Sequence, residues 1–158
     1  MTRRYVSILV VGEAITVVSA EVPDDDKQPI RINSDTTWKL QKGDRGPALA
    51  VLHQRCASYL TEHKADLVVI KASALPTGSA KLALLESAEV RGVVIAAAAS
   101  VLGEVKILSK AVISRTYGER KVDEYLKDDD FWNQQTEGGV LRKTSREAAM
   151  LIIAQRNA

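Results

Sequence analysis

Immediately before Lys71 the sequence carries an uninterrupted apolar run, Leu67-Val68-Val69-Ile70. Branched apolar residues without alternation are typical of a strand buried on both faces, at the centre of a sheet covered by helices. A proline-containing loop follows, and Ser79 is a suitable N-cap for a long helix from Lys81 to Leu102. The two elements predict one half of an α/β domain, with Lys71 at the carboxyl end of its central strand.

The long predicted helix carries small and apolar residues at helical spacing. Its expected buried stripe consists of Leu84, Leu85, Ala88, Gly92, Ile95, Ala99 and Leu102. Small residues recur at Ala88, Gly92, Ala96 and Ser100. Because small side chains let another backbone approach closely, this face is expected either to pack on the sheet or to form a homodimer.

The other elements are predicted from hydrophobic periodicity and turn residues. Strands are expected at Tyr5–Val11, Ala14–Val22, Ile30–Asn33 and Val105–Leu108, and helices at 46–64, 109–117, 119–126 and 148–155. Ile30–Asn33 is expected at a sheet edge, residues 34–43 as irregular structure, and residues 133–139 as a loop or lid. Thr144 and Glu147 have the spacing of a capping box. This order predicts a mixed five-stranded sheet: an antiparallel meander of three strands, then alternating α and β elements, with helices on both faces.

Length and composition indicate a single domain that spans residues 1–158. Hydrophobic residues make up 46% of the chain and charged residues 27%, which is ordinary for a globular protein. The formal net charge of +2 is too small to identify a nucleic-acid binder by itself. A single cysteine, Cys56, excludes an internal disulfide and a cysteine-based zinc site. No apolar run is long enough to span a bilayer and no signal peptide is visible, so a cytoplasmic protein without membrane contact is expected.

The order of elements resembles that of the RuvC-type Holliday junction resolvases, a branch of the ribonuclease H-like superfamily. The resemblance rests on Ala65-Asp66-Leu67-Val68-Val69-Ile70, Glu89-Val90-Arg91-Gly92-Val93-Val94-Ile95-Ala96-Ala97-Ala98, Ser109-Lys110-Ala111-Val112-Ile113, Gly118-Glu119-Arg120-Lys121-Val122 and Glu147-Ala148-Ala149-Met150. It implies a ribonuclease H-like fold, a dimer, and a nuclease whose four carboxylates hold two divalent metals. One carboxylate would lie near the end of strand one, one at the end of the central strand, and two in the last helix.

Matched residue by residue, this sequence lacks most of those carboxylates. Gly12 and Glu13 stand near the end of strand one, Lys71 ends the central strand, and Glu147 and Met150 occupy the last pair. An ammonium there opposes divalent cations, since unit charges 4 Å apart repel by about 4 kcal/mol at an effective dielectric of 20. The pattern therefore predicts no metal site, no cofactor and no metal-dependent nuclease activity. Lys71 is expected to hold a phosphate as a point charge, or to be solvated or paired with Glu147.

Three functions are compatible with this pattern, and the first is favoured. It is a catalytically inactive RuvC-like protein that binds duplex or branched DNA through the basic residues Lys71, Lys106, Lys110, Arg115, Arg120, Lys121, Arg142, Lys143 and Arg146. The second is a non-enzymatic scaffold that binds a protein partner through the small-residue helix face and through Trp38, Phe131 and Trp132, which are expected to be exposed. The third is a metal nuclease with relocated carboxylates drawn from Glu13, Asp24–Asp26, Asp128–Asp130 and Glu147.

Overall fold

The computed structural model describes residues 2–79 and 81–158. Three long strands open the chain, helices and strands then alternate, and short helices lead to a final long helix. The elements are β1 (Thr2–Val11), β2 (Ala14–Pro23), β3 (Ile30–Lys39), α1 (Arg45–Glu62), β4 (Leu67–Lys71), α2 (Leu82–Val101), β5 (Val105–Leu108), α3 (Lys110–Tyr117), α4 (Val122–Leu126), α5 (Asp129–Gln135), β6 (Thr136–Glu137) and α6 (Lys143–Arg156).

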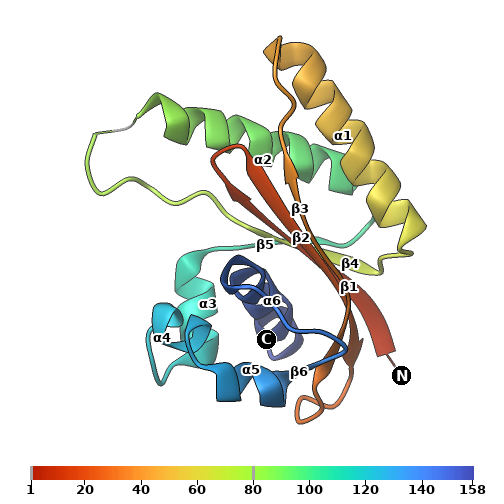
Figure 1. Cartoon of the computed structure of the whole chain (residues 1–158), viewed down its shortest axis with the longest axis vertical. Coiled ribbons are helices and arrows are strands. Elements are labelled where there is room, and N and C mark those ends of the chain that lie inside the picture. The colour runs from red at the N-terminus through yellow and green to blue at the C-terminus, as the bar shows by residue number, and fades with distance from the viewer. Residues whose placement is uncertain (1, 80) are drawn as a thin grey trace.

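A six-stranded sheet in the order β5-β4-β1-β2-β3-β6 forms the centre of the molecule (Figure 1). β1, β2 and β3 make an antiparallel meander, with an irregularity in register between Ser19 and Ala20. β4 pairs in parallel with β1 on one side and with β5 on the other. Because β4 has a strand on each side and a helical layer on each face, Leu67 is 2% exposed and Val68, Val69 and Ile70 are 0% exposed. The predicted α/β arrangement and the interior position of the 67–70 strand are confirmed.

Helices cover both faces of the sheet (Figure 1). Alternate side chains of β4 divide between two cores: Val68 and Ile70 pack with α1 and α2, whereas Leu67 and Val69 pack with α6. Eight residues of α6 are buried, and α3, α4 and α5 extend its layer. Burial on both faces explains why the sequence of β4 does not alternate between apolar and polar residues.

The edge of the sheet beyond β3 differs from the prediction. The prediction of five strands is wrong, because the short strand β6 pairs in parallel with Ile30 and Arg31. Ile30–Asn33 is therefore not at an edge. Residues 133–139, predicted as a loop or lid, contain the end of α5 and all of β6.

The segment 34–39, predicted to be irregular, continues β3 to Lys39. Its polar residues are held by partners distant in sequence: Asp35 accepts hydrogen bonds from Arg142 Nη2 at 3.0 Å and from Ser145 Oγ at 2.6 Å. Trp38 is 4% exposed and packs against α1, so the prediction of an exposed Trp38 is wrong. Trp132 is likewise buried, at 3% exposed, and Phe131 is half-buried.

The predicted helix ends need correction. α2 begins at Leu82, with Lys81 at the N-cap position and no side-chain cap, so Ser79 does not start it. α6 begins at Lys143 with Arg142 at its N-cap, which removes the predicted capping box.

The buried face of α2 is also not the predicted one. Its buried residues are Ser87, Val90, Val94, Ala97 and Ala98. The small-residue face Ala88, Gly92, Ala96 and Ser100 is exposed, as are Leu84 and Leu85. In the described part of the chain, none of the helices has the length and apolarity needed to cross a membrane.

Candidate functional site

The carboxyl ends of β1 and β4 meet α6 at one edge of the sheet. Lys71 is the last residue of β4, and Glu147 lies near the start of α6. The Lys71 Nζ donates a hydrogen bond to Glu147 Oε1 at 2.6 Å, and the two side chains are only 23% and 26% exposed. The ammonium and the carboxylate therefore form a largely buried ion pair at the position where the resemblance would place metal ligands.

β1 contributes an apolar residue to this edge. Its register with β4 pairs Ile8 with Ile70, and one step further along both strands come Leu9 and Lys71. Leu9 is 1% exposed and packs in the core on the α6 face. Gly12 lies beyond the strand, in the hairpin turn at φ +60°, and Glu13 follows it on the exposed tip. The β1 position beside Lys71 is thus occupied by Leu9, which offers no metal ligand.

A cavity of about 40 Å³ lies next to the ion pair, lined by Lys71, Lys110, Asp123, Glu147, Met150 and two apolar residues. Met150 is 0% exposed, so it belongs to the core. Lys110 and Asp123 come from α3 and α4, and sequence reasoning missed Asp123. The packing of α4 beside α6 brings Asp123 here, and no local pattern in the sequence signals that packing.

The donor set at this edge does not fit two divalent metals. Glu147 is bonded to an ammonium, Met150 is buried, β1 offers Leu9, and Asp123 is the one other carboxylate in the lining of the cavity. Over residues 2–79 and 81–158 no three histidine, cysteine, aspartate or glutamate side chains are grouped so that they could hold a metal ion. Two-metal catalysis requires several oxygen ligands on one site, and these residues do not supply them.

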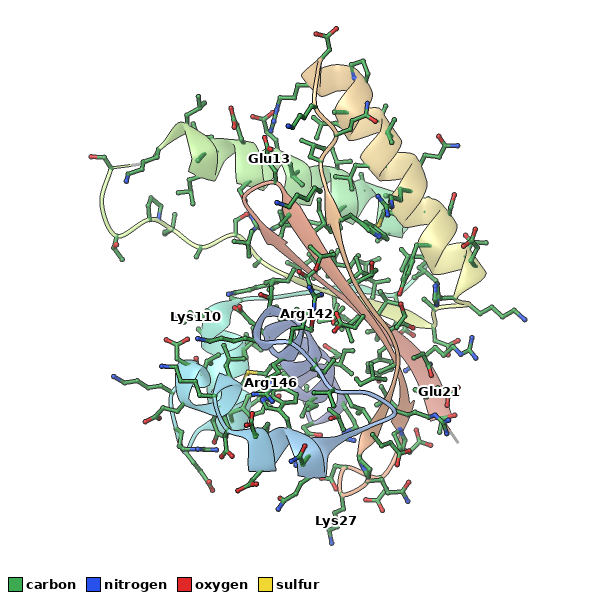
Figure 2. The ribbon with its side chains drawn as sticks, in the orientation of Figure 1. Glu13, Glu21, Lys27, Lys110, Arg142 and Arg146 are labelled. Carbon is green, nitrogen blue, oxygen red and sulfur yellow. The ribbon has the colours of Figure 1, made fainter. Side chains whose placement is uncertain are left out.

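Several of the carboxylates proposed as relocated ligands lie apart from α6 or form ion pairs with arginines. Figure 2 shows Glu13 at the β1–β2 tip beside α2, well apart from α6. Asp128 accepts a hydrogen bond from the backbone N–H of Phe131 and pairs with Arg120 at 2.8 Å, and these two contacts hold the pKa of Asp128 below its ordinary value. Asp129 pairs with Arg146 at 2.7 Å. The structure does not bring these carboxylates together.

The nine predicted nucleic-acid-binding residues separate into two groups. Four form ion pairs within the chain: Lys71 with Glu147, Arg120 with Asp128, Arg142 with Asp35, and Arg146 with Asp129. The Arg120 guanidinium also lies 4.3 Å from the ring centre of Tyr125. The other five are exposed and form no ion pair with a residue that the structure describes: Lys106, Lys110, Arg115, Lys121 and Lys143.

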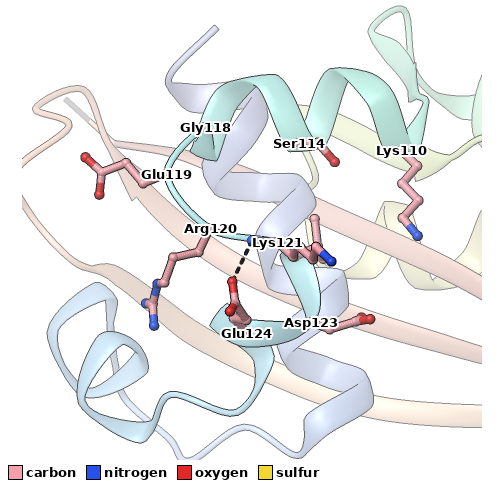
Figure 3. A pocket seen from close by; sticks show the side chains of 9 residues that line it. Lys110, Ser114, Gly118, Glu119, Arg120, Lys121, Asp123 and Glu124 are labelled. Atoms are coloured by element: carbon pink, nitrogen blue, oxygen red, sulfur yellow. Dashed lines mark hydrogen bonds between the residues drawn. The ribbon is translucent and has the colours of Figure 1, made fainter.

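Two of these free lysines line a surface cleft of about 670 Å³ between α3 and α4. Figure 3 shows Lys110, Ser114 and Lys121 around this space, whereas the side chains of Glu119 and Arg120 point away from it. Lys110 and Asp123 line both this cleft and the cavity beside the ion pair. A solvent-accessible cleft lined by both lysines and carboxylates therefore adjoins the Lys71–Glu147 pair.

Cys56 and His63, two side chains that could act as nucleophiles, do not lie at this edge. Cys56 lies in α1, in the core on the opposite face of the sheet, and is 0% exposed. Burial raises the pKa of its thiol from 9.0 to about 11, so the nucleophilic thiolate is disfavoured. His63 lies at the end of α1, stacked on Tyr59 with ring centres 3.9 Å apart.

No protein-family model matches the chain, and no curated protein matches it in sequence. Solved structures are similar in fold. The Thermus thermophilus RuvC structure has a TM-score of 0.74 and 11% identity, and the match covers 98% of this chain and 93% of that one. T. thermophilus RuvC in complex with a Holliday junction substrate has a TM-score of 0.70 and 11% identity, and the match covers 98% of this chain and 93% of that one. The yeast mitochondrial Holliday junction resolvase has a TM-score of 0.68 and 9% identity, and the match covers 98% of this chain and 79% of that one.

These likenesses extend over nearly the whole chain, and at such low identity they establish the arrangement of the backbone. The meander, the interior parallel strand and the terminal helix across the sheet correspond to the architecture expected from the sequence. The chain has the ribonuclease H-like fold of the RuvC Holliday junction resolvases.

Proposed function

We propose that this chain is a catalytically inactive protein of the RuvC fold that binds duplex or branched DNA through a basic surface. The observation that carries the proposal is the Lys71–Glu147 ion pair, with Nζ and Oε1 2.6 Å apart, at the carboxyl edge of β4. The ammonium neutralises Glu147 and supplies a positive charge where metals would otherwise be needed. Among the described residues, no group of three potential metal ligands supports catalysis by two divalent metals here.

Support for DNA as the partner comes from the distribution of free cations. Lys106, Lys110, Lys121 and Lys143 belong to β5, α3, the start of α4 and the start of α6. Figure 2 shows Lys110 and the ion-paired Arg142 and Arg146 on the α3–α6 side of the molecule, and Lys27 in the β2–β3 turn. Lysines without a carboxylate partner can neutralise DNA phosphates independently of the base sequence. One structural neighbour is bound to a Holliday junction substrate.

The absence of cleavage is tested with purified protein, Mg²⁺ or Mn²⁺, and junction, flap and single-stranded substrates. We expect no metal-dependent cleavage. Lys71→Glu is not expected to create activity, because Leu9 still occupies the β1 position, and the new carboxylate would lie against Glu147. Cleavage that survives rigorous purification and is lost in Glu147→Gln would overturn the proposal.

DNA binding is tested by fluorescence anisotropy with a four-way junction, a duplex and a single strand over a range of salt concentrations. Lys110→Gln with Lys121→Gln is expected to weaken binding and to reduce the slope of log K against log salt by about 2, since each phosphate contact contributes about 0.9. The matched control is Lys27→Gln with Lys42→Gln, which removes the same charge from other loops. Equal effects of the two pairs, or no salt-dependent binding at all, would exclude this surface as the binding site.

The second candidate is self-association through α2, as part of a scaffold without enzymatic activity. The observation that favours it is the exposure of Ala88, Gly92, Ala96 and Ser100 on one helix face. A Cβ added at Gly92 would meet no atom within 4 Å, so the face is open to a second backbone. Sedimentation velocity across a range of concentrations tests this candidate, and a monomer throughout would exclude it.

A further inference from the structure

A second cleft, of about 410 Å³, lies between the end of β1, the segment that follows β4, and the first half of α2. Most of the residues that line it are aliphatic, and three of these side chains are exposed to solvent. Val11 is 58% exposed, Leu84 is 40% exposed and Leu85 is 55% exposed. Neither an acidic nor an aromatic residue lines it. Exposed aliphatic side chains gathered around a concavity are typical of a binding site.

Arg91 is a positive charge in the wall of this cleft without a carboxylate partner. Its Nη1 donates to Ser73 Oγ at 2.7 Å and its Nη2 donates to the backbone oxygen of Val10 at 2.9 Å. Its Nε is shut off from solvent and has no acceptor. No carboxylate in the described part of the chain forms an ion pair with Arg91.

The two neutral hydrogen bonds fix the guanidinium but leave its charge uncompensated. Partial burial lowers the pKa of Arg91, which shows that its surroundings oppose the charged form, yet a guanidinium stays protonated in proteins. A carboxylate brought to it in this partly desolvated setting would form a stronger contact than at an open surface. Lys71, the other cation of the cleft, is already paired with Glu147. The cleft thus presents a single unmatched positive charge among aliphatic walls.

We infer that this cleft binds a peptide segment of another protein in which one carboxylate stands next to one or two large apolar side chains. The carboxylate would meet Arg91, and the apolar side chains would cover Val11, Leu84 and Leu85. A nucleic-acid strand fits less well, because the cleft lacks an aromatic platform for bases and offers one free cation rather than several. A two-fold contact between copies at this cleft would bury two Arg91 side chains, one from each copy, and the lining contains no acid to balance them. Peptide binding here and DNA binding near Lys110 are separate properties, so either can fail without the other.

The test begins with selection of phage-displayed random peptides on the immobilised full chain. We expect the enriched peptides to carry Asp or Glu adjacent to large apolar residues. A synthetic, fluorescein-labelled copy of the most enriched peptide is then titrated by anisotropy against the wild type and four variants. Arg91→Gln and Leu85→Glu are expected to weaken binding at least tenfold. Arg91→Lys is expected to bind with intermediate affinity, because it keeps the charge but not the planar fork. Leu82→Glu, in the first turn of α2 but outside the cleft lining, is the matched control and is expected to bind as the wild type does.

Thermal melting of each variant separates loss of binding from loss of fold, and Leu85→Glu covers the case in which Arg91→Gln fails to fold. The inference is overturned if no peptide is enriched, or if the enriched peptides lack an acidic residue. It is also overturned if Leu82→Glu weakens binding as much as Leu85→Glu. A further contradicting result would be displacement of the peptide by a single-stranded oligonucleotide, if the double variant Lys110→Gln with Lys121→Gln shows the same displacement. The last result would assign the cleft to nucleic acid.

Discussion

Breaking the Lys71–Glu147 ion pair is expected to lower the free energy of unfolding by about 2 kcal/mol for either single replacement, Lys71→Met or Glu147→Met. Unit charges 4 Å apart interact by about 1 kcal/mol in bulk water and about 4 kcal/mol at an effective dielectric of 20. Since the two side chains are 23% and 26% exposed, the pair lies between these limits. Lys110 and Asp123 line the same cavity, so each can partly compensate for the charge that a replacement removes. We therefore expect an interaction energy in the lower half of this range.

The measurement is a double-mutant cycle by urea denaturation. Trp38 and Trp132 are 4% and 3% exposed, so their fluorescence reports unfolding of both cores. The double variant is expected to lose about as much stability as one single variant, which gives a coupling energy of about 2 kcal/mol. The control cycle uses Arg3 and Glu104, whose side chains are 41% and 54% exposed with N and O 3.2 Å apart, and its coupling is expected to stay below about 0.5 kcal/mol. Equal coupling energies in the two cycles would show that the Lys71 pair is solvated, and would refute the reasoning that it fills the site electrostatically.

Three further outcomes are expected. Gly138→Ala should destabilise the fold by about 2 kcal/mol or more, because Gly138 has φ +89° and an added Cβ would lie 2.8 Å from the Ile32 oxygen; Gly139→Ala, with open space around it, should change urea stability by under about 0.5 kcal/mol. Gly92→Leu should leave thermal stability unchanged or raise it, since leucine is the better helix former by roughly 1 kcal/mol, while removing any dimer seen by sedimentation; a destabilised monomer would contradict the open surface at Gly92. Cys56 should resist Ellman's reagent at pH 8 until the chain unfolds, because burial raises its thiol pKa to about 11, and rapid reaction in the native protein would contradict that burial.

The sequence predicted the central architecture because its signals there are local. The apolar run 67–70 is too continuous for a half-exposed strand, and the hairpin turn at Gly12 joins two strands of clear β-propensity. The pairing of Lys71 with Glu147 was one of the outcomes expected from the resemblance. The strand at 67–70 and the hairpin at Gly12 could be predicted because each pattern lies within a few residues of sequence.

Other features depend on contacts that no local pattern records. The polar half of β3 is strand because Arg142 and Ser145 bind Asp35 from a distance of more than a hundred residues in sequence. The helix α2 is apolar on both sides, so periodicity alone could not choose between the Val90–Val94 side, which is buried, and the Gly92 side, which is exposed. Asp123 and Arg91 became recognisable as site residues only when the packing of α4 and α2 placed them beside cavities.

The position of α6 in the chain has a consequence for how the protein is made. This helix packs on β1, β2 and β4 and supplies much of one core, yet it begins at Lys143. During synthesis the α6 face of the sheet, with Leu9, Leu67 and Val69, has no cover until more than a hundred residues have been translated. Long-range contacts of this kind are formed slowly, and the uncovered face is prone to aggregation meanwhile. Truncated or stalled chains that end before Lys143 should therefore be substrates for chaperones rather than folded intermediates.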